Sequence, residues 1–207
     1  MDTPLLYFVY DTVRDACKQP SNVFGLGIWT HHIRPMIETA KELAPLHDAD
    51  LELVLICVLL HDYAGIADET FVDQHHIHGA NEARRLLTSK TYPDERIAVV
   101  EDAICSHRGS VPKDRKTNEA RCLADCDAIS HIQQFPSLFY VTYKEQSRSI
   151  EDGADWVTEK LKRDWNKLSS IGRDYIRDTY DGLMSALSIA SQMKHWKTDE
   201  DPNWGSS

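Results

Sequence analysis

The sequence predicts an all-α fold, and two observations on its 207 residues lead to that prediction. Apolar residues recur at intervals of three and four along most of the chain, which is the period of a helix with one buried face. No stretch alternates convincingly between apolar and polar residues, as a half-buried strand would. Hydrophobic residues make up 42% of the chain and charged residues 27%, a profile typical of a globular protein.

The same periodicity places six helices before residue 135 and two or three after it. The first six are predicted at residues 3–18, 31–44, 51–62, 80–88, 95–106 and 118–132. Pro45 should end the second helix, and the interruptions expected in the last third are Pro136, Gly153 and Gly172. We expect one domain over residues 1–196, with a helical extension at 135–196 and a disordered tail at 197–207.

Composition limits the classes of function. The formal net charge of -10 opposes a large nucleic-acid-binding surface, because such a surface needs a basic patch. The five cysteines lack metal-ligand spacing, which indicates reduced thiols. The N-terminus lacks the basic start of a signal peptide, and the apolar run before His61 is too short to span a bilayer. We therefore expect a cytoplasmic protein that binds neither nucleic acid nor membrane.

Residues 51–62 form the most informative stretch. Ten mostly apolar residues run directly into His61 and Asp62. A segment this apolar belongs in a core, where a histidine and an aspartate cost free energy unless something pairs them. A metal ion is the simplest such partner, because it binds imidazole nitrogen and carboxylate oxygen together.

Further ligands are predicted on the buried faces or at the ends of other helices. His32 shares a stripe with Met36 and Ala40, whereas His31 is rotated away by about 100°. His107 continues the apolar stripe of its helix to the C-terminal end, where a neutral core histidine is the simpler reading. Asp127 lies on the apolar face of its helix and needs a compensating cation.

The cluster His75-His76-Ile77-His78 leaves a choice among three histidines. Such a cluster, taken alone, is more often at the surface than at a metal. We favour His78, because it stands at the start of the predicted helical register, and keep His75 and His76 as alternatives, as we keep His31 for His32. The resulting candidate set is His32, His61, Asp62, His78, His107 and Asp127. A set of this kind could hold one or two divalent ions, and its imidazoles favour Mn, Fe, Co, Ni or Zn.

The pattern H…HD…D over roughly residues 20–140 resembles the HD superfamily of metal-dependent phosphohydrolases. His32, the doublet His61-Asp62, and Asp127 followed by Ile129 carry the resemblance. His78 and His107 resemble the two extra histidines of binuclear members, including the HD-type diadenosine tetraphosphate hydrolases. The resemblance implies an HD-type helical bundle with Asp62 as the ligand that bridges two ions.

One departure concerns the substrate. Many members read His-Asp-Ile-Gly-Lys, whereas this chain has Tyr63-Ala64-Gly65 after the doublet, without the lysine. We expect a replacement cation in the basic stretch after His107, at Arg108, Lys113 or Lys116.

The resemblance therefore implies a hydrolase that cleaves a phosphoester or phosphoanhydride bond with metal-activated hydroxide. The expected partner is a small phosphorylated substrate, with a nucleotide as one candidate, and a homodimer is one candidate assembly. Asp62, Arg108 and Lys113 are the expected catalytic residues. Two alternatives stay open: a di-iron oxygenase with the same ligand types, and a non-catalytic regulatory domain that binds a nucleotide and keeps the metal.

Overall fold

A computed structural model describes residues 3–109 and 114–192 of the chain. These residues form helices and no β-strand, which confirms the all-α prediction. The α-helices are α1 (Pro4–Cys17), α2 (Arg34–Leu46), α3 (Leu51–Leu60), α4 (Tyr63–Ala67), α5 (His75–Thr88), α6 (Asp94–Ser106), α7 (Asn118–Gln133), α8 (Phe135–Tyr140), α9 (Ile150–Lys167) and α10 (Ser170–Gln192). Shorter turns of other helical types are η1 (Trp29–Ile33), η2 (Glu69–Gln74) and η3 (Val141–Glu145). Among the described helices, none has the length and apolarity needed to cross a membrane.

Helix α3 is the central element of the N-terminal bundle. It packs against α1, α2, α6 and α7, and residues 53–60 are all buried. Burial on every side explains why this helix has no polar face. The carboxylate of Asp50 starts the helix by accepting hydrogen bonds from the backbone N–H groups of Glu52 and Leu53. The C-terminal end of α3 therefore delivers His61 and Asp62 into the interior of the bundle.

The boundaries of α2 and α5 differ from the sequence prediction in ways that bear on Pro45 and on the clustered histidines. Helix α2 continues through Pro45 and ends one residue later at Leu46, so the proline lies in the last turn of the helix. Helix α5 begins at His75 rather than Ala80, since the 3-10 turn η2 leads directly into it. The histidine at the start of this helical register is therefore His75, five residues earlier than the predicted start of the helix.

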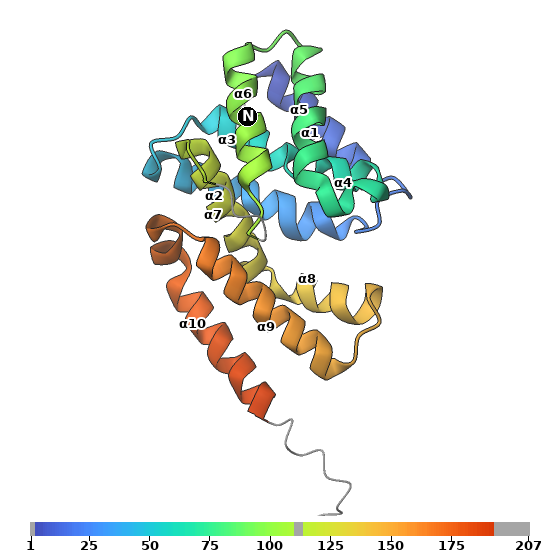
Figure 1. Ribbon diagram of the computed structural model, residues 1–207, viewed down its shortest axis with the longest axis vertical. Helices are drawn as coiled ribbons and strands as arrows, with labels where there is room; N and C mark the ends of the chain where they lie inside the picture. The colour runs from blue at the N-terminus through green and yellow to red at the C-terminus, as the bar shows by residue number, and fades with distance from the viewer. Residues whose placement is uncertain (1–2, 110–113, 193–207) are drawn as a thin grey trace, which may run out of the picture.

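The last three helices form a second layer beneath α7, as Figure 1 shows, with α8 beside α9 and α10 on the other side. The breaks fall at residues 146–149 and 168–169 rather than at Gly153 and Gly172. Both glycines lie in first helical turns that pack closely on other chain segments: a Cβ on Gly172 would stand 2.6 Å from Cγ of the buried Asp125. The predicted tail, 197–207, lies outside the described residues.

Candidate metal centre

The centre is assembled from the ends and faces of five helical segments. His32 lies in the π-helical turn η1, a type of turn that occurs frequently at functional sites. His61 follows the last residue of α3, and His107 follows the last residue of α6. His75 is the first residue of α5, and Asp127 lies in the middle of α7. Helix ends thus bring the imidazoles together, while the body of α7 supplies a carboxylate.

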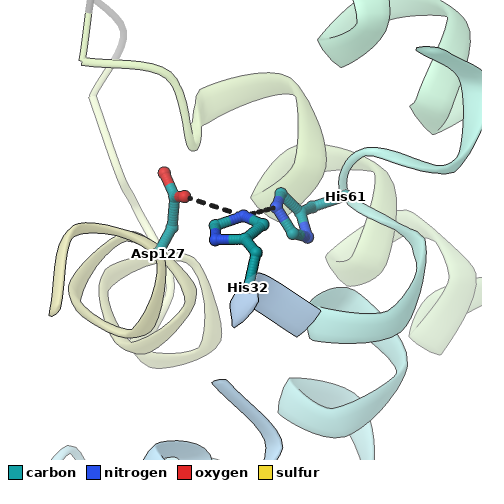
Figure 2. A group of neighbouring side chains, drawn as sticks. All are labelled: His32, His61 and Asp127. Carbon is teal, nitrogen blue, oxygen red and sulfur yellow. Dashed lines mark hydrogen bonds and ion pairs between the residues drawn. The ribbon is translucent and has the colours of Figure 1, made fainter. Parts of the chain in front are cut away.

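His32, His61 and Asp127 form the first half of the centre (Figure 2). His32 Nε2 lies 3.1 Å from His61 Nε2 and 3.4 Å from Asp127 Oδ1. The ligand atoms of all three residues lie within 4.8 Å of one another. Two nitrogens that share one ion at about 2.0–2.1 Å each must lie within about 4 Å of each other, which these do.

Asp62 joins this first half to a second half. Its Oδ2 atom lies 3.2 Å from His61 Nε2 and 3.6 Å from His32 Nε2. Its Oδ1 atom lies 3.2 Å from His75 Nε2 and 3.9 Å from His107 Nε2. One carboxylate oxygen therefore faces each histidine pair, which is the arrangement that a carboxylate bridging two ions requires.

The four imidazoles all present the same nitrogen to the centre. The Nδ1 atoms of His61, His75 and His107 donate to the carbonyl oxygens of Val58, Val72 and Ile104, at 2.9, 2.7 and 2.6 Å. His32 Nδ1 lies 3.1 Å from the hydroxyl of Ser130, whose own proton goes to the carbonyl of His32. Backbone groups that hold Nδ1–H in this way orient metal-ligating histidines and leave Nε2 as the ligand atom.

This orientation creates a need for a cation. With Nδ1 protonated, a neutral imidazole carries only a lone pair on Nε2. Yet the Nε2 atoms face each other in pairs, His32 with His61 at 3.1 Å and His75 with His107 at 3.2 Å. Two facing lone pairs repel unless a proton or a metal ion lies between them. The donor set therefore fits divalent metal ions of the kind that imidazole and carboxylate bind.

The pKa values of the histidines in the centre also indicate a need for a cation. Burial lowers the pKa of His32 to about 4 and holds the pKa of His107 well below its usual value. Burial also opposes the protonation of His61, but the charges of Asp62 and Asp127 outweigh it and raise the pKa of His61 to about 9. One proton at His61 thus serves as the cation of the first half at neutral pH, in the place that a metal ion would take.

Asp127 has a second cation that the sequence analysis missed. Lys167, at the end of α9, donates from its ammonium to Asp127 Oδ2, and the side chains are only 2% and 8% exposed. Burial would raise the pKa of Asp127, yet Lys167 and the neighbouring histidines hold it well below its usual range. Burial of Asp127 is therefore explained by a lysine, and only its Oδ1 atom, beside His32, is turned to the predicted metal position.

Among the three clustered histidines, it is His75 that the structure brings beside Asp62 and His107. His78, the predicted ligand, instead stacks on Phe71 with ring centroids 4.0 Å apart. His76 is buried beside Arg108, 3.5 Å from its Nη1 atom. His31 is exposed and hydrogen-bonds Gln134 at 3.3 Å, so His32 remains the candidate ligand of this pair. The shift from His78 to His75 follows from the earlier start of α5.

The predicted phosphate-binding cations are only partly described. Arg108 is half-buried and donates to the backbone carbonyl of Asp73 at 2.5 Å, on the side of the centre where His75 and His76 lie. Lys116 is exposed, and Lys113 lies outside the described residues. Three further groups stand close to the centre and were not predicted: Lys160, Asp164 and His131. The sequence holds a signal for Asp164 and for Lys167, because both continue the buried face of Val157 and Leu161 at helical spacing.

The fold and this centre define an all-α protein with a buried cluster of histidines and aspartates suited to divalent metal ions. The chain belongs to the HD domain family, whose family model matches residues 29–132. Its structure resembles the crystal structure of a predicted HD superfamily hydrolase from an uncultured Thermotogales bacterium. That likeness has a TM-score of 0.57 at 22% identity and covers 93% of this chain and 94% of the other. A comparison with curated proteins found no match.

Proposed function

We propose that this protein is a metal-dependent phosphohydrolase that cleaves a phosphoester or phosphoanhydride bond of a nucleotide or another small phosphate ester. The observation that carries the proposal is the convergence of four histidine Nε2 atoms on the two oxygens of Asp62. Membership of the HD domain family, and the shared fold of a predicted HD superfamily hydrolase, support an HD-type hydrolase.

Two positions would hold the ions. His32, His61 and Asp127 would bind one ion together with Asp62 Oδ2. His75 and His107 would bind the other together with Asp62 Oδ1. Divalent ions bound there supply an acidified water molecule and positive charge opposite the phosphoryl oxygens.

Access to the centre is on the side of Asp62 and His75. Their side chains are 22% and 19% exposed, whereas those of His61 and His107 are 0% and 3% exposed. A substrate can therefore reach Asp62 from solvent, and the carboxylate can orient a water molecule by accepting its hydrogen bond. Arg108 lies on this side and can direct its guanidinium to a phosphoryl oxygen, where charge-assisted hydrogen bonds are strong.

The test combines metal analysis with a substrate screen. Purified protein should contain up to about two ions of Mn, Fe, Co, Ni or Zn per chain, and should release phosphate or pyrophosphate from some member of a nucleotide and phosphoester panel. Asp62→Asn should lower both the metal content and the activity. Metal-loaded protein that hydrolyses nothing on the panel would overturn the proposal. Substrate-dependent oxygen uptake by the iron-loaded protein, without hydrolysis, would replace it with an oxygenase.

A further inference from the structure

Helix α9 contributes a charged wall to the centre, although it lies outside the matched HD domain residues. Lys160, Asp164 and Lys167 are spaced by four and three residues and so share one face of the helix. Lys160 Nζ donates to both oxygens of Asp164, at 2.7 Å each, and to His131 Nδ1 at 2.9 Å. The wall is thus a connected set of polar groups.

This wall reaches the first half of the centre through His131. The ring of His131 stacks on the ring of His32, with centroids 4.7 Å apart and planes 11° from parallel. Its Nδ1 atom lies 3.6 Å from Asp127 Oδ1, the oxygen that is turned to the predicted ion. Lys160 Nζ is therefore one imidazole away from a predicted metal ligand, on a different side from Arg108.

Exposure separates the groups of the wall into two kinds. The side chains of Lys167 and Asp164 are 2% and 3% exposed, so these residues are fixed within the protein. The side chains of Lys160 and His131 are 22% and 18% exposed, so a ligand can reach them from solvent. These exposures are close to those of Asp62 and His75, the accessible groups of the centre itself.

Charge and hydrogen bonding indicate what such a ligand would be. Lys160 Nζ and Asp164 Oδ2 lie 2.9 and 3.2 Å from the same atom, His131 Nδ1, so these contacts do not fix which ring nitrogen carries the proton. Asp164 is the carboxylate that Lys160 and His131 share, and Asp127 is committed to Lys167 and to the centre. With an ion bound, this corner carries excess positive charge within an otherwise acidic chain.

We propose that Lys160 and His131 form an oxyanion subsite beside the metal centre, and that this subsite binds a phosphoryl oxygen of the substrate. The inference rests on the proposed function and supplies the cation that the chain lacks after its His61-Asp62 doublet. Lys160 contributes the positive charge, and its ammonium donates to the oxyanion in place of one of its contacts with Asp164 and His131. The C-terminal helical extension thereby takes part in substrate binding.

The test is a calorimetric titration of metal-loaded protein with inorganic phosphate. Lys160→Met should weaken phosphate binding by about tenfold or more, because a hydrogen bond to a charged group contributes about 1.5–3 kcal/mol. Lys160→Arg keeps the charge and should stay within about threefold of the natural protein. The matched control is Lys162→Met on the same helix, since Lys162 is exposed and pairs only with Glu159 in a surface ion pair. Urea unfolding and metal content are measured for each variant.

The outcomes separate this inference from the proposed function. If Lys160→Met binds phosphate and metal as the natural protein does, the subsite is refuted even if the enzyme is an active phosphohydrolase. If the variant loses metal together with phosphate affinity, Lys160 acts only through the centre and the subsite is equally refuted. If phosphate affinity falls at unchanged metal content while no phosphate ester is hydrolysed, the subsite stands and the proposed function fails. In an active enzyme, KM should rise in Lys160→Met more than kcat falls.

Discussion

Replacement of Lys167 by methionine should destabilise the metal-free protein by about 3 kcal/mol. Methionine keeps the length and apolar character of the lysine stem and removes only the ammonium. The Asp127 carboxylate, 5% exposed as a residue, then keeps only His32 at 3.4 Å and His131 at 3.6 Å as nearby partners. A buried carboxylate that loses its cation keeps the free-energy cost of desolvation and loses the electrostatic attraction that offset it.

The magnitude follows from the burial of the pair. Removal of one partner from a buried ion pair typically costs about 3–5 kcal/mol, whereas exposed pairs contribute about 0–1 kcal/mol. With side chains only 2% and 8% exposed, Lys167 and Asp127 belong to the first class. The two histidines offset part of the loss, which places the expected value at the lower end. A metal ion bound to Asp127 would supply the missing charge, so the loss should be at least halved in the metal-loaded protein.

The measurement is urea unfolding of the metal-free and metal-loaded forms, followed by circular dichroism and by tryptophan fluorescence. Lys162→Met is the surface control and should change the free energy of unfolding by less than about 0.5 kcal/mol. The double variant Lys167→Met, Asp127→Asn should recover part of the loss, because an amide costs less to bury than a charge. A loss below about 1 kcal/mol in metal-free Lys167→Met, or equal losses with and without metal, would refute the reasoning.

Three further predictions concern the histidine of α5 in the second half of the centre, the protonation of His61 in the first half, and the packing of α10. His75→Ala should lower the metal content by about one ion per chain, while His78→Ala should leave it unchanged; equal effects would contradict the choice of His75. Because the pKa of His61 is raised to about 9, an ion must displace its proton below that pH, and metal affinity should rise about tenfold per unit between about pH 7 and pH 9 and then level off. A flat profile in competition titrations would contradict this. Gly172→Ala should destabilise the protein by about 1–3 kcal/mol, because its Cβ would stand 2.6 Å from a buried carboxylate, whereas Gly182→Ala meets nothing within 4 Å and should be neutral or slightly stabilising in thermal unfolding.

The position of His75 beside Asp62 could not be predicted from the sequence. The sequence shows three histidines in four residues and favours the one at the start of a helix. That rule depends on where the helix starts, and helix boundaries are the least certain part of a sequence prediction. Because η2 leads directly into α5, the helix begins at His75, and its ring reaches Asp62 and His107.

Asp125 and His47 form a contact that the sequence also could not predict. His47 follows the last residue of α2, and it is buried with its Nε2 atom 2.9 Å from Asp125 Oδ2. Asp125 also accepts hydrogen bonds from the backbone and hydroxyl of Ser169, which ties the start of α10 to α7 and α2. These partners lie 78 and 44 residues from Asp125, so no local pattern could reveal them.

The sequence by itself determined the helical class, most helix positions and the association of His32, His61, Asp62, His107 and Asp127, because helical periodicity is local and each of these residues interrupts an apolar stripe. Only the tertiary structure decided which clustered histidine lies beside Asp62 and which cation compensates Asp127. It also decided that Lys160 and Asp164 of α9 stand beside the centre. The physical reason is that burial on one face of a helix can be read from spacing, whereas the partner of a buried charge depends on how distant helices pack.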